Sequence, residues 1–356
     1  MLTMPLFLKT FRPFEYVNTA QAAILLIAFS VTNVVMAQPL TATTATTTST
    51  ESALSINDWL LRMHEATLKK RSYVGTLVQS SPQFMSSARI WHTCDGAQQM
   101  ERIDNLTGAP RSTFRHNDKL VTFMPDAKVV RIEKRESLGG FPELLKPGSG
   151  NIPEFYAVKV LVPERVAGLE ADVIQLQPKD ALRFGYRIWT EKKSNMVLKL
   201  QTLDGNGGVL EQSAFSELQL DAPVKMEKLA QMMAATEGYK VEQPVLTKTT
   251  ANAEGWTLKT SVPGFKALSC FKRSASPGTA NAGGDQTMQW IFSDGLATVS
   301  LFVEDFDKTR HTQEGVMAQG ATHSLFKRIN EFWLTAVGEV PPQTLKAFAQ
   351  GLERKR

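Results

Sequence analysis

The chain has 356 residues, of which 42% are hydrophobic and 21% are charged. This composition excludes a wholly disordered chain and supplies enough apolar side chains for two packed domains. The formal net charge is only +5 and the lysines and arginines are scattered, which argues against a nucleic-acid-binding protein.

The first 37 residues have the pattern of a secretory signal peptide. Basic residues precede an apolar run from Ala20 to Val35, and Val35-Met36-Ala37 places small or modest side chains before Gln38. A transmembrane anchor is the alternative, but the run is interrupted by polar residues and is shorter than the ~20 residues of a span. The residue directly after the cleavage site is Gln38 and not a cysteine, which excludes a lipoprotein anchor. We therefore expect cleavage before Gln38 and a periplasmic mature protein.

Residues 38–54 form a tract rich in threonine and alanine that lacks apolar periodicity, and we expect this tract to be disordered. A helix is predicted next, because Ser55 and Asp58 form a capping box. Apolar or small side chains recur behind it at helical spacing, at Ile56, Trp59, Leu60, Met63 and Thr67.

From Tyr73 onward the hydrophobic period changes to two, which is typical of half-buried strands. Turn-forming residues separate strand candidates at 73–78, 87–92, 98–103, 119–124, 129–133, 157–161, 165–169 and 171–177. A long loop, Gly139 to Gly150, interrupts this series, and loops of this length are usually functional or mobile.

A three-strand meander at residues 182–220 completes the first domain, which spans 55–220. In its first strand Phe184, Tyr186 and Ile188 alternate with Arg183, Gly185 and Arg187, so the sequence places Arg183 on the polar face. Asp204 to Gly208 supplies the following hairpin loop. These antiparallel strands predict a strongly curved sheet that wraps around an apolar interior.

Residues 221–254 are predicted to be a linker with a short helix, and a smaller second domain is predicted at 255–356. Its strand candidates lie at 256–260, 265–272, 287–292, 296–303, 323–329 and 332–337, with a flexible tip at 278–284. Pro341-Pro342 then opens a helix with an apolar face at Leu345, Phe348, Ala349 and Leu352. The second domain is therefore predicted to be a small antiparallel sheet with a terminal helix.

The sequence gives no indication of an enzyme, a metal site or a cofactor site. The histidines lack the spacing of metal ligands, occurring singly at His64, His92, His116, His311 and His323. No G-x-S-x-G nucleophile elbow is present, and Gly205 to Gly208 lacks the third glycine of a dinucleotide-binding loop. We expect a binding protein rather than a catalyst.

The chain contains two cysteines, Cys94 and Cys270, one in each predicted domain. In an oxidising compartment they could pair and clamp the domains together. The alternative is two buried thiols.

Five apolar residues of the meander are candidates for a lipid cavity, because they offer more apolar surface than one helix can cover. They are Tyr186, Ile188, Met196, Leu198 and Leu200. The loop from Gly139 to Gly150 would lie at the mouth of this cavity. The alternative is that the five pack with Trp59 and Met63 into a solid core.

Several motifs resemble the MucB/RseB family of sigma-E regulatory proteins, and together they cover essentially the whole mature chain. In the first domain they are Arg183-Phe184-Gly185-Tyr186-Arg187-Ile188-Trp189, Leu203-Asp204-Gly205 and Leu210-Glu211-Gln212; in the second they are Ser293-Asp294-Gly295-Leu296 and Val337-Gly338-Glu339-Val340-Pro341-Pro342-Gln343-Thr344. The tryptophan-bearing meander is also similar to the lipoprotein carriers LolA and LolB.

The resemblance implies a mainly β chain with some α structure (α+β). Its first domain would be a LolA/LolB-like unclosed, curved β-barrel with a packed helix, and a smaller sheet-and-helix domain would follow. It also implies a negative regulator that binds the periplasmic domain of a membrane-spanning anti-sigma factor of the RseA or MucA type. Such regulators shield this partner from regulated proteolysis, and lipid or lipopolysaccharide releases them.

The alternative is a periplasmic lipid or lipoprotein carrier, but a carrier is complete after one barrel, so the second domain favours the regulator. The resemblance and the exposed sheet edges expected here assign partner binding mainly to this domain, with help from the cleft between the domains. Its candidate residues are Phe302, Phe332 and Trp333, next to expected sheet edges at Asp294-Gly295 and 332–337. These aromatic residues could instead belong to the core of the domain. The oligomeric state stays open, a homo-oligomer included.

Overall fold

The computed structural model describes residues 54–68, 72–96, 98–134, 152–274 and 287–355. The predicted signal peptide, residues 38–53 of the threonine-rich tract, the loop at 139–150 and the tip at 278–284 lie outside these residues. Ala53–Arg356 form one compact unit. None of the helices in the described ranges combines the length and the apolar character that a membrane span requires.

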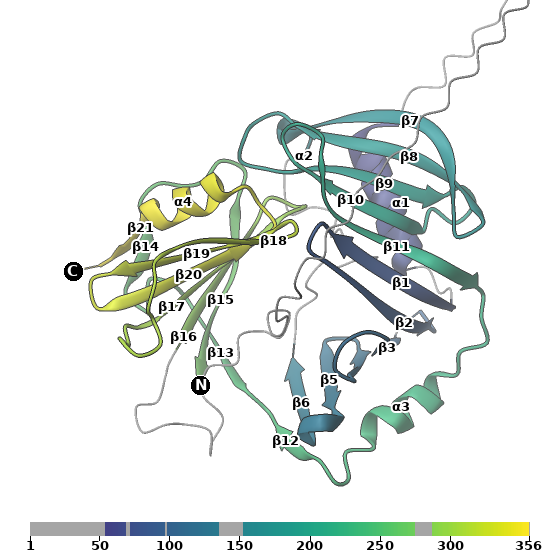
Figure 1. Cartoon of the computed structure of the whole chain (residues 1–356), viewed down its shortest axis with the longest axis horizontal. Helices are drawn as coiled ribbons and strands as arrows, with labels where there is room; N and C mark the ends of the chain where they lie inside the picture. The colour runs from purple at the N-terminus through teal and green to yellow at the C-terminus, as the bar shows by residue number, and fades with distance from the viewer. Residues whose placement is uncertain (1–53, 69–71, 97, 135–151, 275–286, 356) are drawn as a thin grey trace, which may run out of the picture. The chain divides into compact units, whose positions relative to one another are not determined.

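Twelve strands form the first sheet, in the order β12-β6-β5-β4-β3-β2-β1-β11-β10-β9-β8-β7 (Figure 1). Their bounds are β1 (Tyr73–Ser81), β2 (Phe84–Cys94), β3 (Gln99–Asn105), β4 (Ser112–His116), β5 (Lys119–Met124), β6 (Val129–Lys134), β7 (Tyr156–Val166), β8 (Leu169–Pro178), β9 (Gly185–Glu191), β10 (Val197–Leu203), β11 (Val209–Leu220) and β12 (Lys240–Glu242). Only the β12 to β6 pairing is parallel within this sheet. β7 and β12 remain as its two edges, so the sheet does not close, as the family resemblance implied.

Two helices cover separate parts of this sheet. α1 (Ile56–Leu68) begins at the predicted capping box, where the backbone N–H of Asp58 donates to Oγ of Ser55 at 3.2 Å. Its apolar side packs on strands β8 to β10. α3 (Met226–Ala234) packs on strands β3 to β6 through Leu229 and Met233. The short elements η1 (Pro125–Ala127) and α2 (Ile152–Phe155) lie in the connections.

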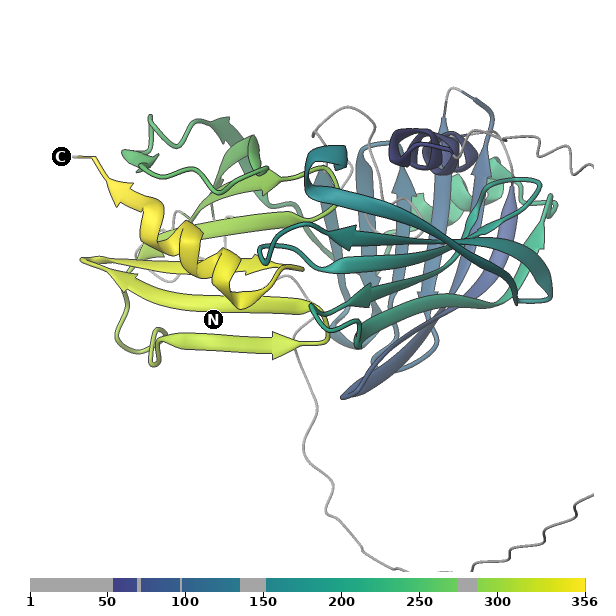
Figure 2. The ribbon, with the colours of Figure 1, turned by 90° about the horizontal axis from the view of Figure 1, so that it is seen from above.

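Seven strands form the second sheet, in the order β13-β15-β16-β17-β20-β19-β18. Their bounds are β13 (Val245–Thr249), β15 (Lys266–Ser274), β16 (Thr287–Ser293), β17 (Thr298–Asp305), β18 (Gly315–Gln319), β19 (Thr322–Ile329) and β20 (Phe332–Gly338). Figure 2 shows α4 (Pro342–Gly351) lying across this sheet. Leu345 and Phe348 of α4 are fully buried in the core between helix and sheet.

Besides the edge strand β18, which was not predicted, the part of the chain that follows β12 differs from the expectation in three places that involve distant segments. Residues 245–249, which the sequence suggested to be linker, form its edge strand β13. The terminal helix ends at Gly351, and Leu352 begins β21 (Leu352–Arg354), which pairs with β14 (Trp256–Leu258). The strand predicted at 332–337 lies between β17 and β19, so the expected sheet edge there is wrong. Each difference depends on pairing between distant segments, which local periodicity does not report.

Candidate functional site at the junction of the two sheets

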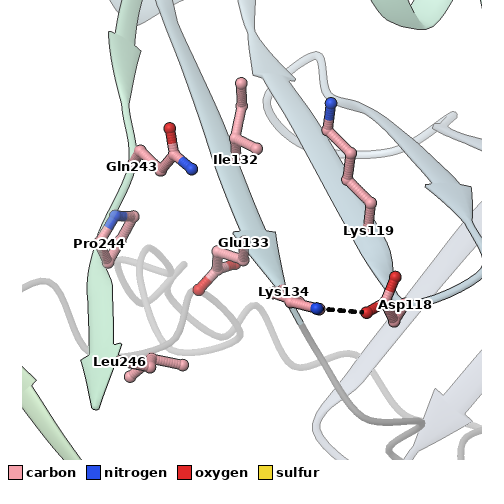
Figure 3. Close-up of a pocket in the computed structure, with 8 residues that line it drawn as sticks. All are labelled: Asp118, Lys119, Ile132, Glu133, Lys134, Gln243, Pro244 and Leu246. Atoms are coloured by element: carbon pink, nitrogen blue, oxygen red, sulfur yellow. Dashed lines mark ion pairs between the residues drawn. The ribbon is translucent and has the colours of Figure 1, made fainter.

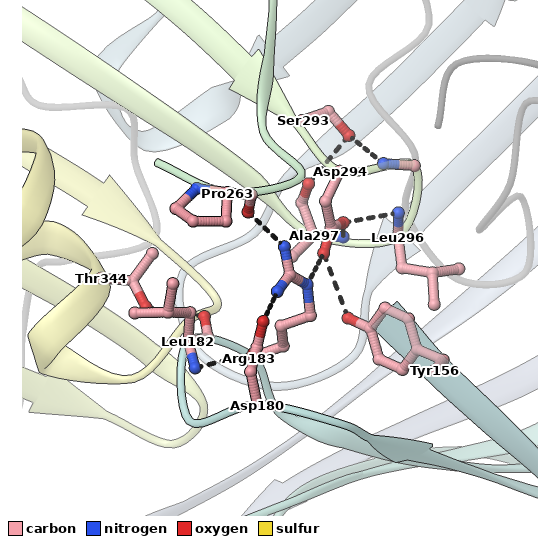
Figure 4. Close-up of polar contacts among 11 residues, drawn as sticks. Tyr156, Asp180, Leu182, Arg183, Pro263, Ser293, Asp294, Leu296, Ala297 and Thr344 are labelled. Atoms are coloured by element: carbon pink, nitrogen blue, oxygen red, sulfur yellow. Dashed lines mark hydrogen bonds and ion pairs between the residues drawn. The ribbon is translucent and has the colours of Figure 1, made fainter. Parts of the chain in front are cut away.

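A buried ion pair joins the two sheets. Arg183 lies between β8 and β9, Asp294 lies in the hairpin between β16 and β17, and both side chains are 0% exposed. Nε of Arg183 donates to Oδ2 of Asp294 at 2.9 Å (Figure 4). The hydroxyl of Tyr156 donates to the same oxygen at 3.2 Å. One carboxylate oxygen of the second sheet is therefore held by two groups from the first.

The other two guanidinium nitrogens of Arg183 each donate a hydrogen bond as well. Nη1 donates to Asp180, and Nη2 donates to the backbone carbonyl of Pro263 at 2.5 Å. The guanidinium carbon lies 4.2 Å from the ring centroid of Phe155 and 5.3 Å from that of Phe265. This arrangement fits the chemistry of arginine, whose planar fork bonds several acceptors at once and whose faces stack on aromatic rings. The buried charge is thus compensated on every side.

The Ser293-Asp294-Gly295 sequence explains how Asp294 reaches across. Its Oδ1 accepts the backbone N–H groups of Leu296 at 2.9 Å and Ala297 at 2.8 Å, which fixes the hairpin turn. Gly295 adopts a φ of +103°, which favours glycine. Ser293 completes the turn by donating to the carbonyl of Ala297 at 2.8 Å. Because Oδ1 serves the turn, Oδ2 is left to face the first sheet.

Each sheet also places a leucine against the core of the other. Leu296 of the hairpin packs against the core beneath α1, while Leu182 packs against the core beneath α4. The backbone around Leu182 is held by the start of α4, where Oγ1 of Thr344 donates to its carbonyl at 2.6 Å. Gln343 donates to the preceding carbonyl, that of Ala181. The junction therefore couples two hydrophobic cores through one polar centre.

Two buried tyrosines border this centre. Burial raises the pKa of Tyr156 well above 10, and the neighbouring Tyr186 and Asp294 add to that shift. Burial likewise raises the pKa of Tyr186 well above 10. Both phenols are therefore neutral at physiological pH, which lets Tyr156 act as a hydrogen-bond donor to the carboxylate.

Further from the ion pair, a second polar contact links the sheets. The backbone N–H of Ala321, which precedes β19, donates to Oε2 of Glu211 in β11 at 3.4 Å. Gln79 of β1 donates to the other oxygen of the same carboxylate. This contact does not depend on Arg183 or Asp294.

The five predicted cavity residues do not share one face. Tyr186, Ile188 and Leu200 lie in the core beneath α1, where Trp59 and Met63 also pack, whereas Met196 and Leu198 lie in two other clusters. The cause is a register shift in β10 between Val197 and Lys199, where one extra residue reverses the alternation. Packing accounts for the burial of all five, and lipid binding stays a prediction.

The three predicted partner-binding residues divide between the two faces of the second sheet. Phe332 packs on the core beneath α4, with its ring 5.1 Å from that of Trp256. Trp333 alternates with it, is 4% exposed and stacks on His311 at a centroid distance of 4.8 Å. Phe302 is half-buried in β17, on the face away from the core, because Leu301 and Val303 point into that core.

The disulfide that Cys94 and Cys270 could form is absent from the structure. Cys94 ends β2 in the first sheet, whereas Cys270 is buried in the core of the second. Burial raises the pKa of the Cys270 thiol to about 11. The alternative of two buried thiols therefore holds for Cys270, whereas Cys94 is half-buried.

A groove of about 300 Å³ lies beside the end of β6 (Figure 3). There β12 stops pairing with β6, and Pro244, which has no N–H to continue the ladder, leads the chain away. Its walls carry charges of both signs, including Lys134, whose Nζ lies 3.2 Å from Oδ2 of Asp118. None of the predicted site residues lines it.

Residues 55–233 match the MucB/RseB N-terminal domain, and residues 250–353 match the MucB/RseB C-terminal domain. The chain belongs to the MucB/RseB family. Arg183 lies in the first matched region and Asp294 in the second, so the junction is made between the two domains of this family.

Curated members of the family are similar over most of their length. The sigma-E factor regulatory protein RseB of Haemophilus influenzae is 24% identical, covering 83% of this chain and 90% of the relative. The sigma factor AlgU regulatory protein MucB of Pseudomonas aeruginosa is 27% identical, with the same coverage.

Solved structures of MucB share the fold. A crystal structure of MucB in complex with MucA(peri) has a TM-score of 0.62 at 23% identity, covering 85% of this chain and 100% of that chain. The complex of Pseudomonas aeruginosa MucA and MucB gives a TM-score of 0.63, with 84% and 99% covered. The mainly β, two-sheet fold expected from the motifs is thereby confirmed.

Sequence reasoning missed Arg183 and Asp294 as a pair. Both residues stood in motifs that carry the family resemblance, which was the available signal. The alternation in the meander placed Arg183 on the polar face, but β9 begins only at Gly185 and Arg183 turns into the junction.

Proposed function

We propose that this protein is a periplasmic negative regulator of a sigma-E type response. It binds the periplasmic region of a membrane anti-sigma factor and shields that region from proteolysis. The observation that carries this proposal is the presence of both family domains over nearly the full length of named sigma-factor regulators. A carrier of one barrel would lack the second sheet. The solved relative bound to MucA(peri) indicates the kind of partner.

The test is direct binding and protection. The chain from Gln38 to Arg356 is mixed with the purified periplasmic region of a MucA-type anti-sigma factor from the same organism. We expect saturable binding by calorimetry and slower cleavage of that region by an added protease. An unrelated periplasmic protein of similar charge is the control. Absence of binding at micromolar concentrations would overturn the proposal.

The second sheet is the proposed main contact for the partner. Phe302 is half-buried on the face away from α4, as a recognition residue requires. Phe302→Ala is expected to weaken binding, whereas Phe332→Ala is expected to act mainly on stability, because Phe332 packs on the core. A chain that stops after Glu242 removes the whole second sheet, including β13, and is expected not to bind.

Release by a lipid is a further part of the proposal. Tyr186, Ile188 and Leu200 form one wall of the core beneath α1, so an acyl chain would enter there by displacing the helix. Each buried methylene of such a chain contributes about 0.8 kcal/mol. A fluorescent acyl probe that shows no saturable binding to the full chain would rule this out.

Export is tested separately. The mature protein is expected to begin at Gln38 and to be recovered in the periplasmic fraction. N-terminal sequencing that finds Met1 on a membrane-bound chain would contradict this expectation. No catalytic role is proposed.

A further inference from the structure

The contacts at the junction are mostly directional. Arg183 donates to Asp294, Asp180 and the carbonyl of Pro263, and Tyr156 donates to Asp294. Buried ion pairs add little net stability compared with apolar packing of the same volume, but they fix geometry. These contacts therefore contribute more to fixing the orientation of the two sheets than to the free energy that holds the sheets together.

A polar junction also costs less free energy to open than an apolar one. When apolar cores separate, they expose surface that water does not favour. When Arg183 and Asp294 separate, both charges regain hydration, so much of the lost attraction is replaced. Interfaces between domains of one chain resemble transient interfaces, and relative motion is their default. Among the contacts of the junction, the Arg183–Asp294 pair is the one whose separation hydration offsets most.

The closed junction is linked to elements of both sheets. Tyr156 and Leu296 pack with the core beneath α1, and Asp294 begins the connection to β17, the strand that carries Phe302. A displacement of the hairpin at Asp294 therefore alters the packing of the core beneath α1. It also shifts β17, the strand proposed to contact the partner.

We propose that Arg183 and Asp294 form a latch, and that the anti-sigma segment binds the closed junction. The inference rests on the proposed function and names the regulation of the same binding event. Arg183 and Asp294 are then positioning residues, which act through the placement of the two sheets. If the closed state is populated to a fraction f, the apparent Kd rises by the factor 1/f. Reducing f to one tenth would weaken binding tenfold.

Asp294→Asn is the sharpest test, because the two carboxylate oxygens have separate roles. The amide oxygen of asparagine can still accept the N–H groups of Leu296 and Ala297, so the turn is kept. The amide nitrogen then faces Nε of Arg183 and the hydroxyl of Tyr156, which are both donors. We expect at least a tenfold rise in Kd for the anti-sigma segment.

Asp204→Asn is the matched control. Asp204 also precedes a glycine in a hairpin, and its Oδ1 accepts the backbone N–H groups of Asn206 and Gly208, both at 2.8 Å. Its hydrogen bonds in the described structure stay within that hairpin. The same change of charge and shape is expected to alter Kd by less than twofold.

Opening is read independently by hydrogen exchange of the full chain. In Asp294→Asn, exchange is expected to increase at 180–184 and 293–297 and to stay unchanged in the centres of β10 and β17. Should this variant fail to fold, Arg183→Lys and Tyr156→Phe take its place. Lysine keeps the positive charge but lacks the planar guanidinium group that bonds several acceptors at once. The loss of affinity in Arg183→Lys is therefore expected to lie between those of Tyr156→Phe and Asp294→Asn. Tyr156→Phe removes one bond and is expected to raise Kd about twofold.

The outcomes separate the two proposals. If the unaltered chain does not bind the anti-sigma segment, the proposed function fails and the latch proposal fails with it. If the unaltered chain binds, and the junction variants show faster exchange at the junction with unchanged Kd, the latch proposal alone is overturned. Weaker binding together with faster exchange confined to the junction supports it.

Discussion

Replacing Gly264 by alanine tests the geometry around Arg183 without touching either charge. Gly264 follows Pro263 and has a φ of +81°. A methyl group there would overlap Nη2 of Arg183 and come within 3.0 Å of the ring of Phe155. Gly264→Ala is therefore expected to strain the backbone and also to push the guanidinium out of place.

The cost of backbone strain can be separated from the cost of steric overlap. Alanine in the left-handed region costs about 1–2 kcal/mol. Overpacking a well-packed site costs typically about 1–3 kcal/mol more. Gly238 has a φ of +79° and no atom within 4 Å of the added methyl group. Gly238→Ala is therefore expected to lose about 1–2 kcal/mol, and Gly264→Ala about 2–5 kcal/mol.

The measurement is urea unfolding followed by tryptophan fluorescence, with midpoint and slope compared for the two variants. A lower midpoint for Gly264→Ala at equal slope is expected. Equal losses in the two variants would show that Arg183 is not fixed against Gly264, and the geometry of the junction would then be wrong.

The other predictions concern a thiol, a carboxyl and the terminal helix. Because burial raises the pKa of Cys270 to about 11, this thiol is expected to react with Ellman's reagent at pH 8 only after unfolding, and fast native reaction would contradict its placement. Loss of hydration and then Glu211 raise the pKa of Glu339 to about 7. The folded state thus holds this proton more tightly than the unfolded state. Because Glu339 is exposed to solvent, screening keeps the resulting fall in stability between about pH 4.5 and 7 small, and Glu339→Gln is expected to flatten it in pH-dependent unfolding. Phe348→Ala is expected to lower the unfolding free energy by about 3–5 kcal/mol. Replacement of the exposed Gln350 by alanine is expected to lower it by less than about 0.5 kcal/mol. Equal decreases in the two variants would refute the placement of Phe348 in the core.

Local patterns in the sequence were sufficient for most of the elements. α1 was predicted from Ser55, Asp58 and helical spacing, because capping and amphipathic packing both act within a few residues. The hairpins at Asp204 and Asp294 were predicted for the same reason, since their turns are made by their own side chains. The family motifs then indicated the two-domain order.

Face assignment failed where the backbone is irregular. The alternation of Met196, Leu198 and Leu200 predicted one shared face, but the bulge in β10 sends Leu198 to the other side. A bulge inserts one residue without a distinctive composition, so periodicity alone does not reveal it.

The sequence by itself determined most of the segments that become strands and helices and which motifs belong to the family. Only the tertiary structure decided that Arg183 meets Asp294, 111 residues further along the chain. The physical reason is that a charge in an apolar stretch looks the same in sequence whether it ends in water or against a distant partner. Its partner is set by the pairing of strands and by the contact between two cores, which are long-range properties of the folded chain.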